Sequence, residues 1–222
     1  MITQVAKDWP ETVMFICYPA GMNFLAHLVL AGDSEPLRLG AMLGDFVRGQ
    51  AALQDFPADV REGIRLHRRI DAHTDALPEI GALREWFPGE FRRYAGIVID
   101  LAIDHELAGR FDAYSEVGLE AFDREVRAML ARHAEWVPER LQRFMDYADR
   151  RGLFAAYREE SEILHSLRGI GRRLSRPNPL HRVDEIWPDL QPLVSANFAA
   201  VFRLAQSDVA DWLKSRSTIT GS

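Results

Sequence analysis

One histidine and two aspartates recur at every fourth residue in one stretch of the chain: His67, Asp71 and Asp75. In an α-helix, residues four apart lie one above the other on the same face. An imidazole and two carboxylates on one stripe could bind a divalent metal. The alternative is a solvated helix face with an ordinary charge pair, so the interpretation depends on matching ligands elsewhere in the chain.

A second polar group interrupts the most hydrophobic stretch of the sequence. Asp100 and Asp104 lie four residues apart within an apolar run, and His105 follows directly. A carboxylate inside an apolar helix must be paired, hydrogen-bonded or bound to a metal, because burying an isolated charge costs too much free energy. The pattern therefore favours either a metal-binding or catalytic role or a buried salt bridge to an arginine.

Two further candidates stand in apolar surroundings. Asp45 lies between Gly44 and Phe46 in a mostly hydrophobic run. A glycine weakens a helix by about 1 kcal/mol relative to alanine, so the close approach of another group could explain Gly44. Asp45 could alternatively cap a short following turn. His27 lies among hydrophobic residues, where a lone histidine is more often a hydrogen-bonded core residue than a ligand.

The remaining histidines supply no second constellation. His73 lies off the stripe of His67. His133, His165 and His181 lie among charged or loop residues, so we expect these three at the surface. The sequence contains neither a Gly-x-Ser-x-Gly nucleophile motif nor a phosphate-binding Gly-x-x-x-x-Gly-Lys loop. These absences disfavour nucleophilic catalysis by the chain, whereas the residues could support hydrolysis by a metal-activated water.

The elements that must position these side chains are all helical. Apolar residues recur with helical spacing, and no stretch shows sustained alternation or an Asn-Gly or Asp-Gly hairpin turn. Capping residues, prolines and glycines place the predicted helices at residues 24–31, 35–49, 57–74, 78–87, 90–111, 119–136, 138–151, 153–174 and 188–212. We therefore predict an all-α fold, a single-domain helical bundle.

The composition is that of a globular protein, with 222 residues of which 47% are hydrophobic and 27% charged. A net charge of −6 argues against a general nucleic-acid binder, and no run is long enough to span a bilayer. We therefore expect neither nucleic acid nor a membrane as a partner, and the oligomeric state stays open. The single cysteine, Cys17, fits a reducing, cytoplasmic environment.

Amphipathic periodicity begins only after Met22. We therefore expect residues 1–21 to be a peripheral N-terminal extension, with Met22 as the original start. Residues 22–214 should form the helical domain, and residues 215–222 a tail.

Three motifs in the same order resemble the acyl carrier protein phosphodiesterase family, also called acyl carrier protein hydrolase. They are MNFLAH at residues 22–27, GDFVRG at residues 44–49 and HRRIDAHTD at residues 67–75. The resemblance extends from Met22 to about Lys214 and includes the Asp104–His105 pair and the arginine-rich distal part. Three ordered motifs are a far more specific signal than any one of them.

The resemblance implies an all-helical, HD-like fold, a divergent relative of the HD-type metal phosphohydrolases. It implies hydrolysis of the phosphodiester that joins 4′-phosphopantetheine to a serine of holo-acyl carrier protein, which releases apo-acyl carrier protein. It also implies a divalent metal, with Mn²⁺ favoured and Mg²⁺ also used. The chain departs from the HD signature because it has no His-Asp dipeptide; Asp104–His105 is the reverse order.

With this resemblance, the candidate residues can be given roles. The metal ligands we predict are Asp45, His67, Asp71 and Asp104. Asp71 would also take part in catalysis, His105 or His27 would protonate the leaving serine oxygen, and Arg69 would stabilise charge on the phosphoryl group. Asp75 and Asn23 would support the ligands from outside.

An acidic enzyme that binds an acidic carrier protein needs a local basic face. For this role we predict, from the paired arginines, Arg68, Arg92, Arg93, Arg150 and Arg151. Arg68 could also face the phosphoryl group with Arg69, although both point away from the His67 stripe and could simply be exposed. Two alternatives remain: an HD-like phosphohydrolase that acts on a nucleotide, and a non-catalytic helical binding module in which the acidic and histidine residues form structural pairs.

Overall fold

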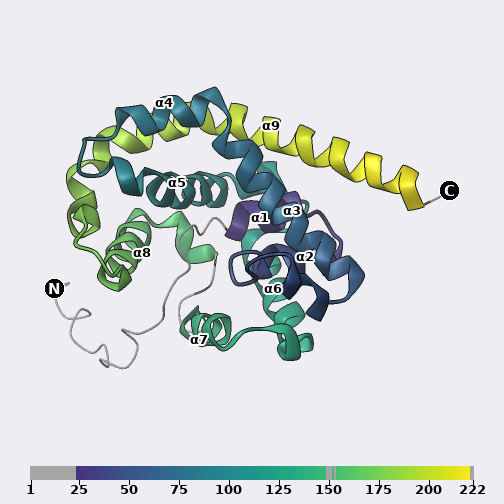
Figure 1. The fold of residues 1–222 in the computed structure, drawn as a ribbon. Helices are drawn as coiled ribbons and strands as arrows, with labels where there is room; N and C mark the ends of the chain where they lie inside the picture. The colour runs from purple at the N-terminus through teal and green to yellow at the C-terminus, as the bar shows by residue number, and fades with distance from the viewer. Residues whose placement is uncertain (1–23, 149–151, 153, 221–222) are drawn as a thin grey trace.

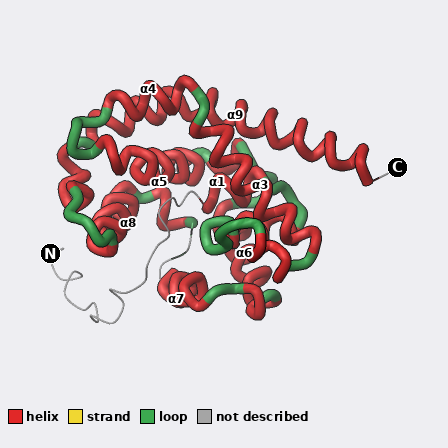
Figure 2. The backbone as a smooth tube through the Cα atoms, in the orientation of Figure 1, coloured by secondary structure: helices red, strands yellow, loops and turns green. Residues whose placement is uncertain are grey.

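Helices make up the chain in the computed structural model, which describes residues 24–148, 152 and 154–220. No strand occurs among these residues (Figure 2), which confirms the predicted all-α bundle. The predicted extension at residues 1–21 lies outside the described residues. The α-helices are α1 (Phe24–Leu30), α2 (Glu35–Leu43), α3 (Ala58–Asp75), α4 (Pro78–Trp86), α5 (Ala95–Gly109), α6 (Leu119–Arg132), α7 (Glu139–Ala148), α8 (Glu160–Arg173) and α9 (Trp187–Thr220).

Helix α5 lies at the centre of the bundle. Its apolar residues are buried on almost every side, as the continuous hydrophobic run predicts. It contacts α1, α4, α8 and α9, and Figure 1 shows α4 and the first part of α9 side by side along it. The two aspartates of this run, Asp100 and Asp104, therefore lie on the element that the other helices surround.

Helices α2 and α3 cross with their backbones in contact. A Cβ atom added at Gly40 would lie 2.3 Å from the carbonyl oxygen of Val60, and one at Gly63 would lie 2.5 Å from that of Leu37. Pro36 is in the first turn of α2, which the fixed proline φ suits, and Pro57 is the residue just before α3. Because both crossing positions lack side chains, the helices approach closely, and α3 carries His67 against the end of α2.

Helix α9 runs along α3, α4 and α5 (Figure 1). Its buried face includes Val194, Phe198, Val201, Ala205 and Val209. The helix continues beyond the end predicted at residue 212 and reaches Thr220, so the first residues of the expected tail are helical. None of the described helices has the length and apolar character needed to span a membrane.

Several predicted helices are wrong in their bounds. The helix predicted over residues 90–111 is Ala95–Gly109, and the one predicted over residues 119–136 ends at Arg132. The helix predicted over residues 35–49 ends at Leu43, and the glycines at 44 and 49 accompany a turn in which Gly49 has a φ of +77°. The helix predicted over residues 153–174 begins only at Glu160. A separate 3-10 segment (Ala155–Arg158) precedes it, and the extended backbone of Glu159 (φ −91°, ψ 117°) separates the two.

Candidate metal centre

Two buried histidines and an aspartate from α1 and α3 meet at one point. His27 Nε2 lies 3.0 Å from Asp71 Oδ1, and His67 Nε2 lies 3.3 Å from Asp71 Oδ2. The two imidazole rings stack with centroids 3.9 Å apart. Among the described residues, His27, His67 and Asp71 form a group whose ligand atoms all lie within 4.8 Å of one another. The predicted stripe on α3 thus supplies two members, and α1 supplies the third.

The ring of His67 is held in one orientation. Its Nδ1 donates a hydrogen bond of 2.8 Å to the carbonyl oxygen of Ala41, which directs Nε2 toward Asp71 and Asp45. Such a bond from the far ring nitrogen is typical of metal-binding histidines. A Cβ atom at Gly44 would lie 2.2 Å from Cγ of His67, so only glycine fits there. This contact confirms the close approach that the sequence predicts at Gly44.

Asp45 lies directly after α2 and extends the group. Its Oδ1 is 3.4 Å from His67 Nε2, whereas its Oδ2 is buried and has no hydrogen-bond partner in the described part of the chain. A buried carboxylate oxygen without a partner is costly, and a bound cation would satisfy it. The structure therefore brings Asp45, His67 and Asp71 together, as the sequence predicts.

The two histidines differ in protonation. Burial and the neighbouring His67 lower the pKa of His27, although Asp71 opposes this. Burial also disfavours the charged form of His67, but the carboxylates of Asp45 and Asp71 outweigh it and raise the pKa of His67 to about 10. Burial opposes ionisation of Asp71, yet both histidines hold its pKa well below the usual value. At neutral pH these shifts favour an imidazolium at His67 and a neutral imidazole at His27.

Asp104 supports α1. It is fully buried, and its two carboxylate oxygens accept backbone N–H bonds from Leu25 at 3.0 Å and Ala26 at 2.9 Å. The first N–H groups of a helix have no partner within it, so Asp104 caps α1 from α5 and thereby positions His27. Burial raises the pKa of Asp104 to about 8 against the effect of these two bonds. Its role as a metal ligand stays a prediction.

Asp100 is a residue near the group that our assignment of roles omitted. Burial raises its pKa well above the usual value, and the negative charges of Asp71 and Asp75 add to the rise, followed by those of Asp104 and Asp45. No described residue forms a hydrogen bond or ion pair with Asp100. The signal was present in the sequence, since Asp100 and Asp104 are one helical turn apart in an apolar run.

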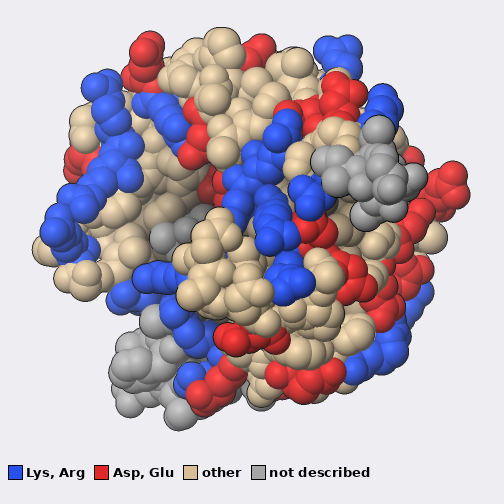
Figure 3. Space-filling model, turned by 45° about the vertical axis from the view of Figure 1, so that its right-hand side comes forward, with Lys and Arg blue, Asp and Glu red and all other residues tan. Residues whose placement is uncertain are grey.

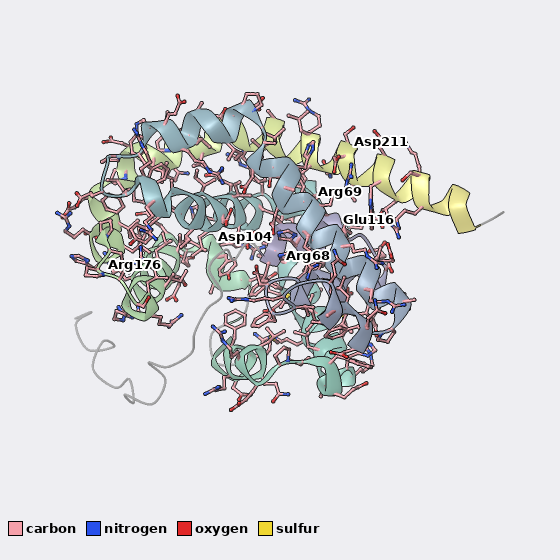
Figure 4. The ribbon with its side chains drawn as sticks, in the orientation of Figure 1. Arg68, Arg69, Asp104, Glu116, Arg176 and Asp211 are labelled. Atoms are coloured by element: carbon pink, nitrogen blue, oxygen red, sulfur yellow. The ribbon has the colours of Figure 1, made fainter. Side chains whose placement is uncertain are left out.

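The two arginines that follow His67 make different contacts. Arg68 donates from Nη2 to the carbonyl oxygens of Val47 at 2.7 Å and Gly49 at 3.1 Å, which ties α3 to the turn after Asp45. Arg69 binds Asp208 of α9 through Nε and Nη2, at 2.8 and 2.6 Å. In Figure 4, Arg69 lies on the side of α3 toward α9. The guanidinium of Arg69, for which we predicted a catalytic role, is thus engaged in a bidentate ion pair with Asp208.

Several other predicted residues lie outside the group. His105 donates from Nδ1 to the carbonyl oxygen of Tyr157 at 2.7 Å, and Asp75 binds Arg84 at 2.5 Å. Arg92 donates to the carbonyl oxygen of Glu85 at 3.3 Å. The predicted residues Asn23, Arg150 and Arg151 lie outside the described residues.

His73, which lies off the predicted stripe, and His133, which we expected at the surface, both have acidic partners. His73 lies 3.4 Å from Asp208, and His133 lies 2.8 Å from Glu35. Both partners come from distant parts of the chain, which residue spacing does not show.

Comparison with known proteins gives one consistent result. The model of the family described as "Acyl carrier protein phosphodiesterase" matches residues 22–205. Proteins of that name from Salmonella agona (strain SL483), Salmonella heidelberg (strain SL476) and Salmonella enteritidis PT4 are each 39% identical over 170 residues, which cover 76% of this chain and 86% of the relative. No solved structure matches, so the relation to the HD-type hydrolases stays a prediction. The chain belongs to the acyl carrier protein phosphodiesterase family.

Proposed function

We propose that this protein hydrolyses the phosphodiester between 4′-phosphopantetheine and a serine of holo-acyl carrier protein, which yields apo-acyl carrier protein. The observation that carries the proposal is the buried group of His27, His67 and Asp71 in a chain of this family. Phosphodiester hydrolysis requires positioned groups that stabilise negative charge on phosphoryl oxygens, and a group of this composition can assemble them. The reducing cytoplasm suits a chain whose only cysteine is Cys17.

The donor set fits a divalent metal. His27, His67 and Asp71 would hold it, and Asp45 offers a further buried oxygen that has no partner among the described residues. Mixed imidazole and carboxylate ligands suit Mn²⁺, and Mg²⁺ would be held through more waters. When bound, such a metal polarises a phosphoryl oxygen and makes a coordinated water more acidic.

The chain's own residues contribute orientation and charge. Asp71 contacts both imidazoles and thereby fixes their relative position. Arg68 uses Nη2 for its two carbonyl bonds, so Nε and Nη1 have no partner among the described residues and can donate to a phosphoryl oxygen. Of the two histidines predicted as proton donors, His27 is in the group, whereas His105 binds the backbone of the 3-10 segment before α8.

The carrier protein would bind an arginine-rich surface next to α5 and α8. Tyr94 donates a hydrogen bond to the carbonyl oxygen of Pro177 at 3.3 Å, which brings the turn before α5 beside the one after α8. Arg93 and Arg176, the latter labelled in Figure 4, have no ion-pair partner among the described residues. Figure 3 shows Lys and Arg side chains gathered along one edge and near the centre of a face, on either side of a hollow. An acidic carrier protein would complement such a surface.

The test is incubation of the purified protein with holo-acyl carrier protein and Mn²⁺, with the carrier mass followed by mass spectrometry. We expect loss of the phosphopantetheine arm, and no loss with excess chelator or with Asp71→Ala. Turnover of a nucleotide with an unchanged carrier protein would replace this function with a nucleotide hydrolase. Absence of both turnover and metal binding would favour the non-catalytic module.

A further inference from the structure

We propose that the last part of α9, residues 206–216, is a brace for α3, and that Asp208 is the positioning residue through which it acts. The inference rests on the proposed function, because the side chains that the brace would position are His67 and Asp71. The family model matches the chain only as far as residue 205. The brace therefore lies beyond the matched range, although it contacts the helix that carries the candidate metal ligands.

Opposite sides of α3 carry the two sets of contacts. His67 and Asp71 are one turn apart and face α1 and the end of α2. Arg69 and His73 are also one turn apart, and each lies two residues after a member of the first pair, about 200° around the helix. Arg69 and His73 both contact Asp208 of α9. Asp208 thus binds the face of α3 opposite to the one that carries His67 and Asp71.

The geometry of the Asp208 contact resists rotation of α3. Arg69 donates to both carboxylate oxygens, at 2.8 and 2.6 Å, and His73 Nδ1 lies 3.4 Å from Oδ1. The Asp208 side chain is only 14% exposed, so this pair is less screened than an ordinary surface ion pair. A bidentate arginine–carboxylate pair fixes direction as well as distance.

A second ion pair extends the contact along α3. Arg216 of α9 binds Glu62 of α3, and its guanidinium lies 4.8 Å from the ring centre of Trp212. Val209, the residue after Asp208, is buried. The order of contacts, Asp208 with Arg69 and Arg216 with Glu62, shows that α9 runs antiparallel to α3.

The opposite contact of α3 explains why a brace matters. Against α2, the helix packs through Gly40 and Gly63, where backbone meets backbone and no side chains interlock. That contact sets the distance between the helices, and the bonds of His67 and Arg68 hold α3 on this side alone. A rotation would move His67 and Asp71 relative to His27, and metal sites tolerate errors of only about 0.5 Å in ligand position.

The test compares Asp208→Asn with Asp211→Asn in the full-length protein. Asp211 is on the same helix and 71% exposed, and Lys214 is its ion-pair partner, so its substitution removes the same charge without touching α3. We expect Asp208→Asn to weaken Mn²⁺ binding by about three- to tenfold. This effect is smaller than that of removing a residue that hydrogen-bonds a metal ligand directly. The value of kcat should fall by a similar factor while KM for holo-acyl carrier protein stays within about twofold. Asp211→Asn should behave as wild type.

Two further variants separate positioning from other roles. Asp208→Glu keeps a carboxylate for Arg69 and should recover part of the Mn²⁺ affinity. Arg69→Met combined with Asp208→Asn should be no worse than Asp208→Asn alone, because Asp208→Asn already breaks the ion pair that Arg69→Met removes. A direct catalytic role of Arg69 would instead make Arg69→Met much worse in kcat than Asp208→Asn.

Amide hydrogen exchange of α3, measured in the metal-free protein, tests whether α9 braces α3 and does not depend on enzymatic activity. Faster exchange across residues 62–75 in Asp208→Asn, but not in Asp211→Asn, is the expected result. If exchange, Mn²⁺ affinity and kcat of Asp208→Asn all match wild type, Asp208 is not a positioning residue. If the wild type neither binds Mn²⁺ nor acts on the carrier protein, the proposed function fails, and the exchange experiment alone decides whether α9 braces α3.

Discussion

His67 shows how much a single residue depends on its immediate surroundings. The ring is bonded at Nδ1 to Ala41, stacked on His27 and touched on its side by Gly44. The carboxylates of Asp45 and Asp71 face its Nε2. In the metal-free protein a proton on Nε2 supplies the positive charge that these carboxylates need, and a metal ion would take over that role.

Gly44→Ala should damage the site directly. The new Cβ would lie 2.2 Å from Cγ of His67, so the ring must move and its bond to Ala41 must break or stretch. We expect Mn²⁺ affinity to fall by about tenfold or more, as for loss of a supporting hydrogen bond to a ligand. Isothermal titration calorimetry measures this affinity.

Gly81→Ala is the matched control. Gly81 is within α4, and a Cβ atom there would meet nothing within 4 Å. Alanine should therefore raise stability by about 0.5–1 kcal/mol and leave Mn²⁺ affinity unchanged. Equal Mn²⁺ affinity in the two variants would contradict the proposed role of Gly44.

The raised pKa of His67 predicts a pH dependence of both stability and metal binding. Its folded value of about 10 exceeds the ordinary 6.5, so His67 stabilises the metal-free fold fully below about pH 6.5 and loses this contribution as the pH rises toward 10. A metal must displace this proton, so Mn²⁺ affinity should rise by about tenfold per pH unit between roughly pH 7 and 9.

Calorimetry in two buffers of different ionisation enthalpy would count the released protons, with one proton per Mn²⁺ expected. Asp71, whose pKa is lowered, stays ionised throughout this range and adds no slope. An affinity that does not change with pH would show that His67 is not protonated before the metal binds.

At the scale of the elements, α1 depends on α5. Asp104 binds the first turn of α1 although the two segments are 79 residues apart in sequence. Helix α1 is short, and without this cap its first N–H groups would lose their buried acceptors. The position of His27 is therefore set by a residue that does not itself belong to the group.

Asp104→Ala should lower the free energy of unfolding by about 1–3 kcal/mol, because two buried N–H groups lose their acceptor. Urea unfolding measures this change. Glu116→Ala, at the exposed position labelled in Figure 4, is the control and should change stability by less than about 0.5 kcal/mol. Mn²⁺ affinity should fall in Asp104→Ala alone, since only there is His27 displaced.

The sequence predicted the contacts between residues that are close in the chain and missed those between residues that are far apart in it. The pairing of His67 with Asp71 and the close approach at Gly44 depend on helical spacing and residue size, so both were predictable. The contacts of Asp104 with α1 and of Arg69 with Asp208 join residues 79 and 139 positions apart. Periodicity carries no information over such distances, and the predicted roles of these two residues therefore missed their partners.

At the scale of the whole molecule, the net charge of −6 hides an uneven distribution. Many arginines pair with nearby carboxylates, but Arg93 and Arg176 have no such partner among the described residues. Arg93→Ser combined with Arg176→Ser should raise KM for holo-acyl carrier protein by about three- to tenfold at low salt, with little change in kcat. Steady-state kinetics at two salt concentrations measures both.

Arg203→Ser provides the comparison for the docking surface. Arg203 is exposed on α9 and takes no part in the contact between Tyr94 and Pro177. Its removal should leave KM unchanged. If the KM of the double variant equals that of wild type at every salt concentration, the carrier protein does not bind at Arg93 and Arg176.

The glycine contact between α2 and α3 also bears on the order of folding. Asp45, His67 and Asp71 belong to one helical hairpin, residues 35–75, whose contacts are short in sequence and should form early. His27 can contact this hairpin only after α1 has packed on α5. That step requires closure of a much longer loop. We expect Gly40→Ala to slow refolding and Asp104→Ala mainly to speed unfolding, as stopped-flow kinetics would show. One half of the site would then exist before the other half arrives.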